Sequence, residues 1–125
     1  MTYGKFATAI KCMDGRTQLP VIEFMKWKFG VDYVDMVTEA RADKVLECAG
    51  ACLDSVKSRA EVSVKKHGSK VMAIVGHHDC AGNPVCKEDH IEDIRNSVKA
   101  ASGWFPGVKV VGLWIDDEWN VNEIC

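Results

Sequence analysis

The sequence predicts an α/β fold class: a three-layer sandwich in which a mainly parallel central sheet of about four strands lies between helices. Two observations predict this class. Strand-like and helix-like segments alternate along the chain, and the strand-like segments are apolar runs with little polar alternation, which is typical of strands covered on both faces. The chain has 125 residues, so we predict a single domain over residues 1–125.

The first part of the chain predicts a strand, a helix and a second strand. Residues 3–11, "YGKFATAIK", predict the first strand. Residues 18–29, "QLPVIEFMKWKF", predict a helix that Gly30 can end. Its apolar residues recur every three or four positions and so share one face: Ile22, Met25 and Phe29. Residues 31–37, "VDYVDMV", predict the second strand.

The longest helix is predicted over residues 42–67. Apolar residues step through it by three and four: Leu46, Ala49, Leu53, Val56 and Ala60. Its last turn is basic, which suits the negative end of the helix dipole, and Gly68 follows it. Residues 70–75, "KVMAIV", predict a third strand that is buried on both faces.

A third helix is predicted to begin near Pro84, with Asn83 as its N-cap. Its apolar stripe would consist of Ile91, Ile94, Val98 and Ala101. The "FPG" at 105–107 ends this helix, and residues 108–115, "VKVVGLWI", predict the fourth strand. The remaining tail is expected to add a short strand or to cover a sheet edge. We expect the strand order 2-1-3-4.

The composition argues against several kinds of partner. The formal net charge is −2 and there is no basic cluster, so we expect no nucleic-acid partner. No apolar run approaches the ~18 residues of a membrane span, and the N-terminus lacks the features of a signal peptide. We therefore expect a cytoplasmic protein without a membrane partner. Its six cysteines are then expected to be free thiols or metal ligands.

Two polar stretches follow predicted strands. "IKCMDGR", residues 10–16, follows the first strand, and "GHHDC", residues 76–80, follows the third. If these strands are neighbours and the second strand lies outside the first, the winding of the sheet reverses between them. Ligands of open α/β sheets bind in the crevice at such a point, so both stretches are expected to open into one crevice.

Cys12, His77 and Cys80 form a candidate zinc site, because thiolate sulfur and imidazole nitrogen are ligands that zinc prefers. Three protein ligands leave a fourth position for water, which is typical of a catalytic zinc. Asp14 can accept a hydrogen from that water, and the forked guanidinium of Arg16 can hold Asp14. The alternative is two buried thiols, a hydrogen-bonded turn histidine and a structural ion pair.

The other candidate residues favour structural roles. Cys48 and Cys52 lie one helical turn apart and are expected to be small buried thiols. His90, four residues after Cys86, is expected to be a hydrogen-bonded, partly buried histidine rather than a ligand. His78 and Asp79 can face solvent or hydrogen-bond the turn, and His78 can instead relay protons. The remaining candidates are expected to be an inert terminal thiol and core or interface anchors: Cys125, Trp27, Trp104, Trp114 and Trp119.

At these residues the sequence resembles the β-class carbonic anhydrases. "CMDGR" and "GHHDC" are similar to the two zinc-binding signatures of that family. The resemblance implies one zinc ion (Zn2+) per chain on Cys12, His77 and Cys80, with Asp14 and Arg16 as the catalytic dyad. It further implies a parallel α/β sheet, reversible hydration of carbon dioxide to bicarbonate through a zinc-bound hydroxide, and a homodimer or higher homo-oligomer.

The sequence departs from the family pattern in three places. It starts almost at the first strand, without the family's N-terminal helical arm. Residues 37–44, "VTEARADK", replace an Arg-Asn-Ala-Gly-like turn, and Ala81 precedes Gly82 where the family has paired glycines. Two alternatives therefore stay open: a hydrolase of carbon disulfide or carbonyl sulfide on the same site, and a non-catalytic zinc module. Whether water or Asp14 takes the fourth zinc position is also open.

Overall fold

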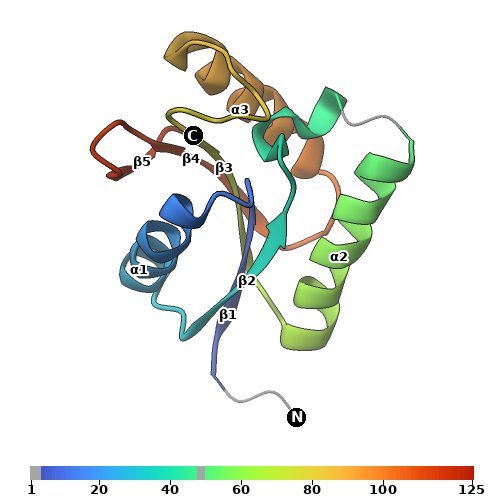
Figure 1. Cartoon of the computed structure of the whole chain (residues 1–125). Helices are drawn as coiled ribbons and strands as arrows, with labels where there is room; N and C mark the ends of the chain where they lie inside the picture. Colours follow the sequence, from blue (N-terminus) through green and yellow to red (C-terminus); the bar gives the residue numbers. More distant parts are fainter. Residues whose placement is uncertain (1–3, 48–49) are drawn as a thin grey trace.

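The computed structural model of the chain describes residues 4–47 and 50–125, and it has the predicted three layers (Figure 1). The sheet has the strand order β2-β1-β3-β4-β5. Its strands are β1 (Phe6–Lys11), β2 (Tyr33–Thr38), β3 (Val71–His77), β4 (Lys109–Ile115) and β5 (Val121–Glu123). The first four are parallel and confirm the predicted order 2-1-3-4, whereas β5 pairs antiparallel with β4 and adds a fifth strand at the edge.

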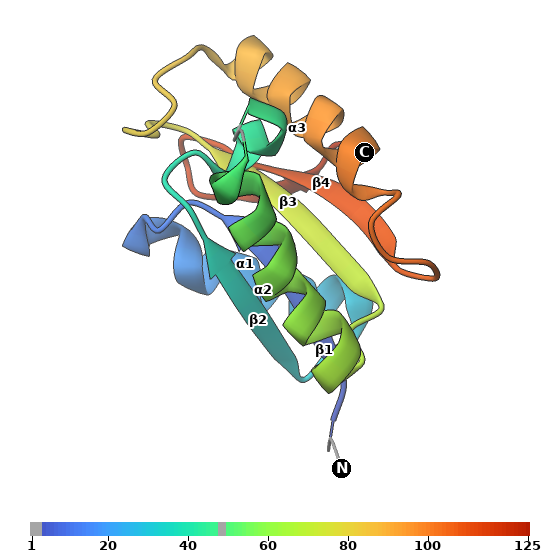
Figure 2. The ribbon, with the colours of Figure 1, turned by 90° about the vertical axis from the view of Figure 1, so that its right-hand side faces the viewer.

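Helices cover both faces of the sheet. Helix α1 (Gln18–Phe29) packs on one face, and α2 (Ala51–His67) and α3 (Lys87–Ala101) cover the other, as Figure 2 shows. Successive residues of each strand point to opposite faces. In β3, Ala73 and Val75 join the core under α1, whereas Met72 and Ile74 join the core under α2 and α3. This two-sided burial explains why the inner strands β1, β3 and β4 are mostly apolar.

The helix predicted over residues 42–67 is wrong in its first part. Residues Ala42–Glu47 form a 3-10 segment, η2, with a non-helical Lys44, and α2 begins only at Ala51. Gly50 precedes α2 with a φ of 56°, which a helix does not allow. Cys48 and Ala49 lie outside the described residues. Cys52 is half-buried rather than buried.

Two element boundaries and the buried face of α1 also differ from the prediction. Helix α3 begins at Lys87, and Cys86 rather than Asn83 occupies its N-cap position, without a side-chain hydrogen bond to the helix. The fully buried pair of α1 is Val21 and Met25, so its core-facing side is rotated from the predicted one. Strand β3 runs on to His77, which makes this residue the end of the strand and not part of the following turn.

The topology brings two strand ends together. Strands β1 and β3 are parallel neighbours, with Thr8 paired to Met72 and Ile10 to Ile74, so both end at the same edge of the sheet. After β1 the chain crosses to β2 on one side, and after β3 it crosses to β4 on the other. This edge is therefore the point at which the winding reverses. Within the described residues, the helices are too short or too polar to cross a membrane.

Candidate metal centre

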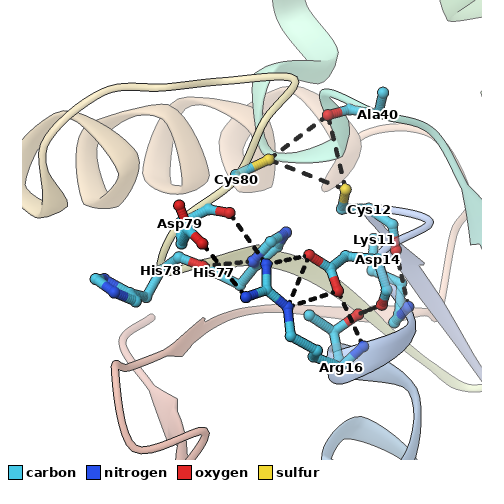
Figure 3. A network of polar contacts seen from close by, with 10 residues as sticks. Lys11, Cys12, Asp14, Arg16, Ala40, His77, His78, Asp79 and Cys80 are labelled. Atoms are coloured by element: carbon cyan, nitrogen blue, oxygen red, sulfur yellow. Dashed lines mark hydrogen bonds and ion pairs between the residues drawn. The ribbon is translucent and has the colours of Figure 1, made fainter.

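Cys12, His77 and Cys80 meet at this edge of the sheet. Cys12 directly follows β1, His77 ends β3, and Cys80 lies in the next turn. All three side chains are buried, and their ligand atoms lie within 4.8 Å of one another. The two sulfur atoms are 3.9 Å apart (Figure 3). The fold thus assembles one group from two distant parts of the chain.

This set of donor atoms fits a zinc ion. Tetrahedral zinc with bonds to sulfur of about 2.3 Å holds two thiolates about 3.8 Å apart, close to the observed 3.9 Å. Nδ1 of His77 lies 2.7 Å from the His78 carbonyl oxygen, which can only accept, so Nδ1 carries the hydrogen. Nε2 then offers a lone pair. It is buried and has no hydrogen-bond partner among the described residues, a deficit that a divalent cation would remove.

Burial sets the protonation of these groups. It lowers the pKa of His77, which keeps the imidazole neutral and able to bind a metal. Burial and the neighbouring Cys12 raise the pKa of Cys80 to about 11. A metal ion that binds near neutral pH must therefore displace a proton from Cys80.

Asp14 and Arg16 form a dyad beside the metal group. Asp14 caps η1 (Gly15–Thr17), and its Oδ1 accepts the backbone N–H of Arg16 at 2.9 Å. The guanidinium donates to both carboxylate oxygens, with Nη2 2.6 Å from Oδ2 and Nε 3.0 Å from Oδ1. These bonds hold the pKa of Asp14 well below its usual range and raise the pKa of Arg16. The carboxylate is thus ionised and fixed in direction. Asp14 does not belong to the group of candidate ligands formed by Cys12, His77 and Cys80.

The turn after β2 closes over the two sulfur atoms. The Ala40 carbonyl oxygen lies 3.8 Å from Sγ of Cys12 and 3.6 Å from Sγ of Cys80, where it can accept from either thiol. This turn packs directly on Gly82. A Cβ atom at position 82 would lie only 1.9 Å from the Ala40 oxygen, so the backbones can approach this closely only with glycine there.

Lys11 forms hydrogen bonds beside the candidate metal site, and this role was not predicted from the sequence. It is the last residue of β1 and is fully buried. Its Nζ donates to the Cys12 carbonyl oxygen at 2.8 Å and to Oε1 of Gln18 at 3.1 Å, and burial lowers the pKa of Lys11. The side chain thereby ties the backbone of one metal-ligand candidate to the start of α1.

A second buried cluster holds the loop that carries Cys80. Nδ1 of His90 forms a hydrogen bond with Oδ2 of Asp43, which confirms the prediction of a hydrogen-bonded histidine. Both residues are 2% exposed. Asn83 donates its side-chain amide to Asp43 at 3.1 Å and to Asp93 at 3.1 Å, which explains why it does not cap α3. Its backbone N–H donates to the Cys80 carbonyl oxygen at 3.3 Å. Asp43 therefore joins η2, the Cys80 loop and α3.

Comparison with known proteins places the chain in a family. Residues 2–125, nearly the whole chain, match the family model described as "Putative carbonic anhydrase". The chain belongs to this family. The resemblance of the two short motifs to carbonic anhydrase signatures therefore extends over residues 2–125. A search among curated proteins found none that matches the sequence.

Solved structures of carbonic anhydrases share the fold. The enzyme from Streptococcus mutans has a TM-score of 0.65 at 17% identity, over 94% of this chain and 81% of that chain. For one of two tetrameric β-carbonic anhydrases from Sordaria macrospora, the TM-score is 0.63 at 13% identity, over 99% of this chain and 82% of that chain. An apo carbon disulfide hydrolase has a TM-score of 0.62 at 13% identity, over 97% of this chain and 79% of that chain. At such identities the likeness shows the fold alone.

Within this carbonic anhydrase fold, two contacts of Arg16 escaped the sequence analysis. Nη1 lies 3.3 Å from Oδ2 of Asp79, and the guanidinium carbon lies 4.5 Å from the centre of the Trp119 ring. Asp79 had a local signal, since it stands between two ligand candidates. Trp119 had none, because only the β4–β5 hairpin brings it back to the site. His78 is exposed, and its backbone N–H donates to Ile115.

Proposed function

We propose that this chain is a zinc enzyme that catalyses the reversible hydration of carbon dioxide to bicarbonate. One observation carries the proposal: the buried Nε2 of His77, without a partner among the described residues, lies with two free thiols beside a carboxylate that an arginine holds (Figure 3). Membership of the carbonic anhydrase family supports the same chemistry.

The residues divide the work between holding the metal and orienting a water. When bound, zinc lowers the pKa of a water molecule so that a nucleophile is present near neutral pH. Cys12 and Cys80 contribute two negative charges as thiolates and His77 contributes none, so the donors balance the charge of a divalent ion. With no net charge on the ion and its three ligands, a neighbouring group is needed to orient the water.

Asp14 is suited to orient that water. A carboxylate accepts about four hydrogen bonds in total, and Arg16 fills both sites on Oδ1 with its backbone N–H and Nε. Oδ2 accepts from Nη2 and shares the Nε hydrogen with Oδ1. Three N–H groups of Arg16 therefore occupy about three of the four acceptor sites, and one site on Oδ2 stays open to a further donor. Because Arg16 keeps Asp14 ionised, the carboxylate can only accept a hydrogen bond, and it would fix the orientation of a water held at the metal site.

The deciding experiment is stopped-flow hydration of carbon dioxide on zinc-loaded full-length protein, with the metal quantified. We expect about one zinc per chain and hydration well above that of buffer. A Cys12→Ser variant is expected to lose both the zinc and the activity. Protein that holds one zinc per chain and does not accelerate hydration would contradict the proposal.

A second substrate class has support in the shared fold of the carbon disulfide hydrolase. The same donors and the same dyad would then direct a water to carbon disulfide or carbonyl sulfide. Sulfide release from either compound, without hydration of carbon dioxide, would favour this alternative. Zinc-dependent stability with neither activity would instead favour the non-catalytic zinc module.

We further propose a homo-oligomer in a reducing compartment such as the cytoplasm. The tetrameric Sordaria macrospora enzymes of the same fold support an oligomer. The free thiols of Cys12 and Cys80 support a compartment that keeps cysteines reduced.

A further inference from the structure

Two residues near Arg16 have an unusual backbone conformation. Over residues 4–47 and 50–125, the non-glycine residues with positive φ are Asp79, at 58°, and Trp119, at 64°. Aspartate tolerates this left-handed region moderately well, whereas a bulky tryptophan is rare in it. Strained residues of this kind persist where the surrounding structure holds them, and they gather at functional sites.

Both strained residues contact the same guanidinium. Asp79 receives Nη1 of Arg16 on Oδ2 at 3.3 Å and Nη2 on its carbonyl oxygen at 3.3 Å (Figure 3). Trp119 presents its ring to the guanidinium carbon at 4.5 Å, within the range of a cation–π contact. The carbonyl contact depends on the backbone of Asp79, so the left-handed conformation directly shapes the cradle.

Arg16 needs such a cradle because its side chain is 49% exposed. An exposed ion pair with Asp14 alone gains little over the entropy of two mobile side chains. Asp14 holds one edge of the guanidinium, Asp79 a second edge, and Trp119 one face. These three contacts together leave the guanidinium little freedom to rotate.

Trp119 lies in the turn between β4 and β5, which several hydrogen bonds to Asp116 hold in place. Oδ1 of Asp116 accepts the backbone N–H groups of Glu118 and Asn120, each at 3.0 Å. The Asp116 carbonyl oxygen accepts the backbone N–H of Trp119 at 3.0 Å. The turn between β4 and β5 is thus closed around one aspartate, and the position of Trp119 follows from it.

We propose that Asp79 and Trp119 are positioning residues that lock Arg16 and, through Arg16, fix the direction of the Asp14 carboxylate. One comes from the turn between two ligand candidates and the other from the edge hairpin. The dyad is therefore held from two separate elements of the same chain. The effect on turnover rests on the proposed function, whereas the effect on the order of Arg16 does not.

Glycine substitutions separate positioning from folding. Glycine adopts positive φ without strain, so Trp119→Gly and Asp79→Gly each remove a side-chain contact with Arg16 and keep the turn. In the zinc-loaded chain we expect both variants to keep the zinc content of the parent. We expect the melting temperature to stay close to that of the parent for Asp79→Gly and to fall for Trp119→Gly, because the Trp119 ring also packs against the core. We expect the 15N heteronuclear NOE of the Arg16 Nε–H group to fall, and kcat for carbon dioxide hydration to fall about fivefold.

Two further variants serve as controls. Glu118→Ala changes an exposed neighbour of Trp119 in the same turn and should leave both readouts unchanged. Asp79→Asn keeps an oxygen acceptor and a residue that tolerates positive φ, so it should restore most of the Arg16 order that Asp79→Gly loses. Arg16→Lys assigns the Arg16 signal. Because the two glycine variants lie on different elements, misfolding of one leaves the other as the test.

The outcomes distinguish positioning from chemistry. An unchanged Arg16 NOE in the folded glycine variants would overturn the positioning role. A lower NOE with unchanged kcat would overturn its effect on turnover. A parent protein that binds zinc but does not hydrate carbon dioxide would contradict the proposed function, while a fall in Arg16 order in the variants would still support the positioning.

Discussion

At the scale of single residues, the Asp14–Arg16 dyad can be separated from metal binding, because neither residue belongs to the Cys12, His77 and Cys80 group. We expect Asp14→Ala or Arg16→Ala to lower carbon dioxide hydration by about 100-fold or more, with zinc still bound. Stopped-flow assays with metal analysis measure this. Met13→Ala, an exposed residue in the same turn, is the matched control. Near-parent turnover in both dyad variants would refute the assigned roles.

Proton competition at Cys80 predicts how zinc affinity depends on pH. Without a metal, the pKa of Cys80 is about 11, so the thiol is protonated near neutral pH. Binding releases that proton, and affinity therefore rises with pH: this group alone contributes about tenfold per pH unit. Titration against a competing chelator between pH 6 and 8 measures the slope. A pH-independent affinity would contradict this protonation state.

At Gly82, adding a single methyl group should lower both the stability of the fold and the affinity for zinc. A methyl group there would lie 1.9 Å from the Ala40 carbonyl oxygen, so Gly82→Ala must displace the turn that covers both sulfur atoms. We expect a loss of about 1–3 kcal/mol in the free energy of unfolding and weaker zinc binding. Gly103→Ala, where the new Cβ would meet open space, is the matched control. Equal melting temperatures for the two variants would contradict the close approach.

At the scale of elements, Asp43 connects the loop that carries Cys80 to η2 and α3. It binds His90 of α3 and the Asn83 amide. Asp43→Ala would leave His90 buried without this partner and would leave Asn83 with Asp93 as its acceptor. We expect a loss of about 3 kcal/mol in the free energy of unfolding, measured by urea denaturation with and without zinc. The control is Glu92→Ala, an exposed carboxylate on α3. A cost similar to that of the control would show that the cluster is dispensable.

The sequence predicts elements well where local pattern decides them and poorly where distant contacts do. The four parallel strands were predictable because they are short apolar runs, and α1 because its apolar residues recur every three or four positions. The helix over 42–67 failed because Asp43 is drawn to Asn83 and His90, and because Gly50 leaves the helical region. The N-cap at Asn83 failed for the same reason. A buried polar cluster overrides local propensity, and periodicity does not reveal it.

For the candidate metal site, the chemistry of the side chains was enough to predict which three residues meet. Cys12, His77 and Cys80 were predicted from donor type and from their positions after two strands, and the fold brings them within 4.8 Å. The crossover rule supplied the neighbouring strands. The roles of Asp79 and Trp119 at Arg16 could not be predicted in this way, because they depend on a turn conformation and on a hairpin at the far end of the chain.

At the scale of the whole molecule, α1 carries apolar side chains into solvent. Leu19 is 61% exposed and Trp27 is 77% exposed, two turns further along the same helix. We propose that a second copy covers them, and we expect light scattering after size exclusion to give at least a dimer. Trp27→Ser should shift the mass toward the monomer, and the exposed Val62→Ser on α2 should not. A monomeric parent protein would contradict the oligomer.

The sulfur atoms of Cys12 and Cys80 belong to residues 68 positions apart in the chain, and the pairing of β3 with β1 brings them together. Uptake of a coloured substitute ion such as cobalt should therefore lag behind helix formation when the denatured chain is diluted into buffer. The time at which the absorption band of the bound ion appears would then report when β3 pairs with β1.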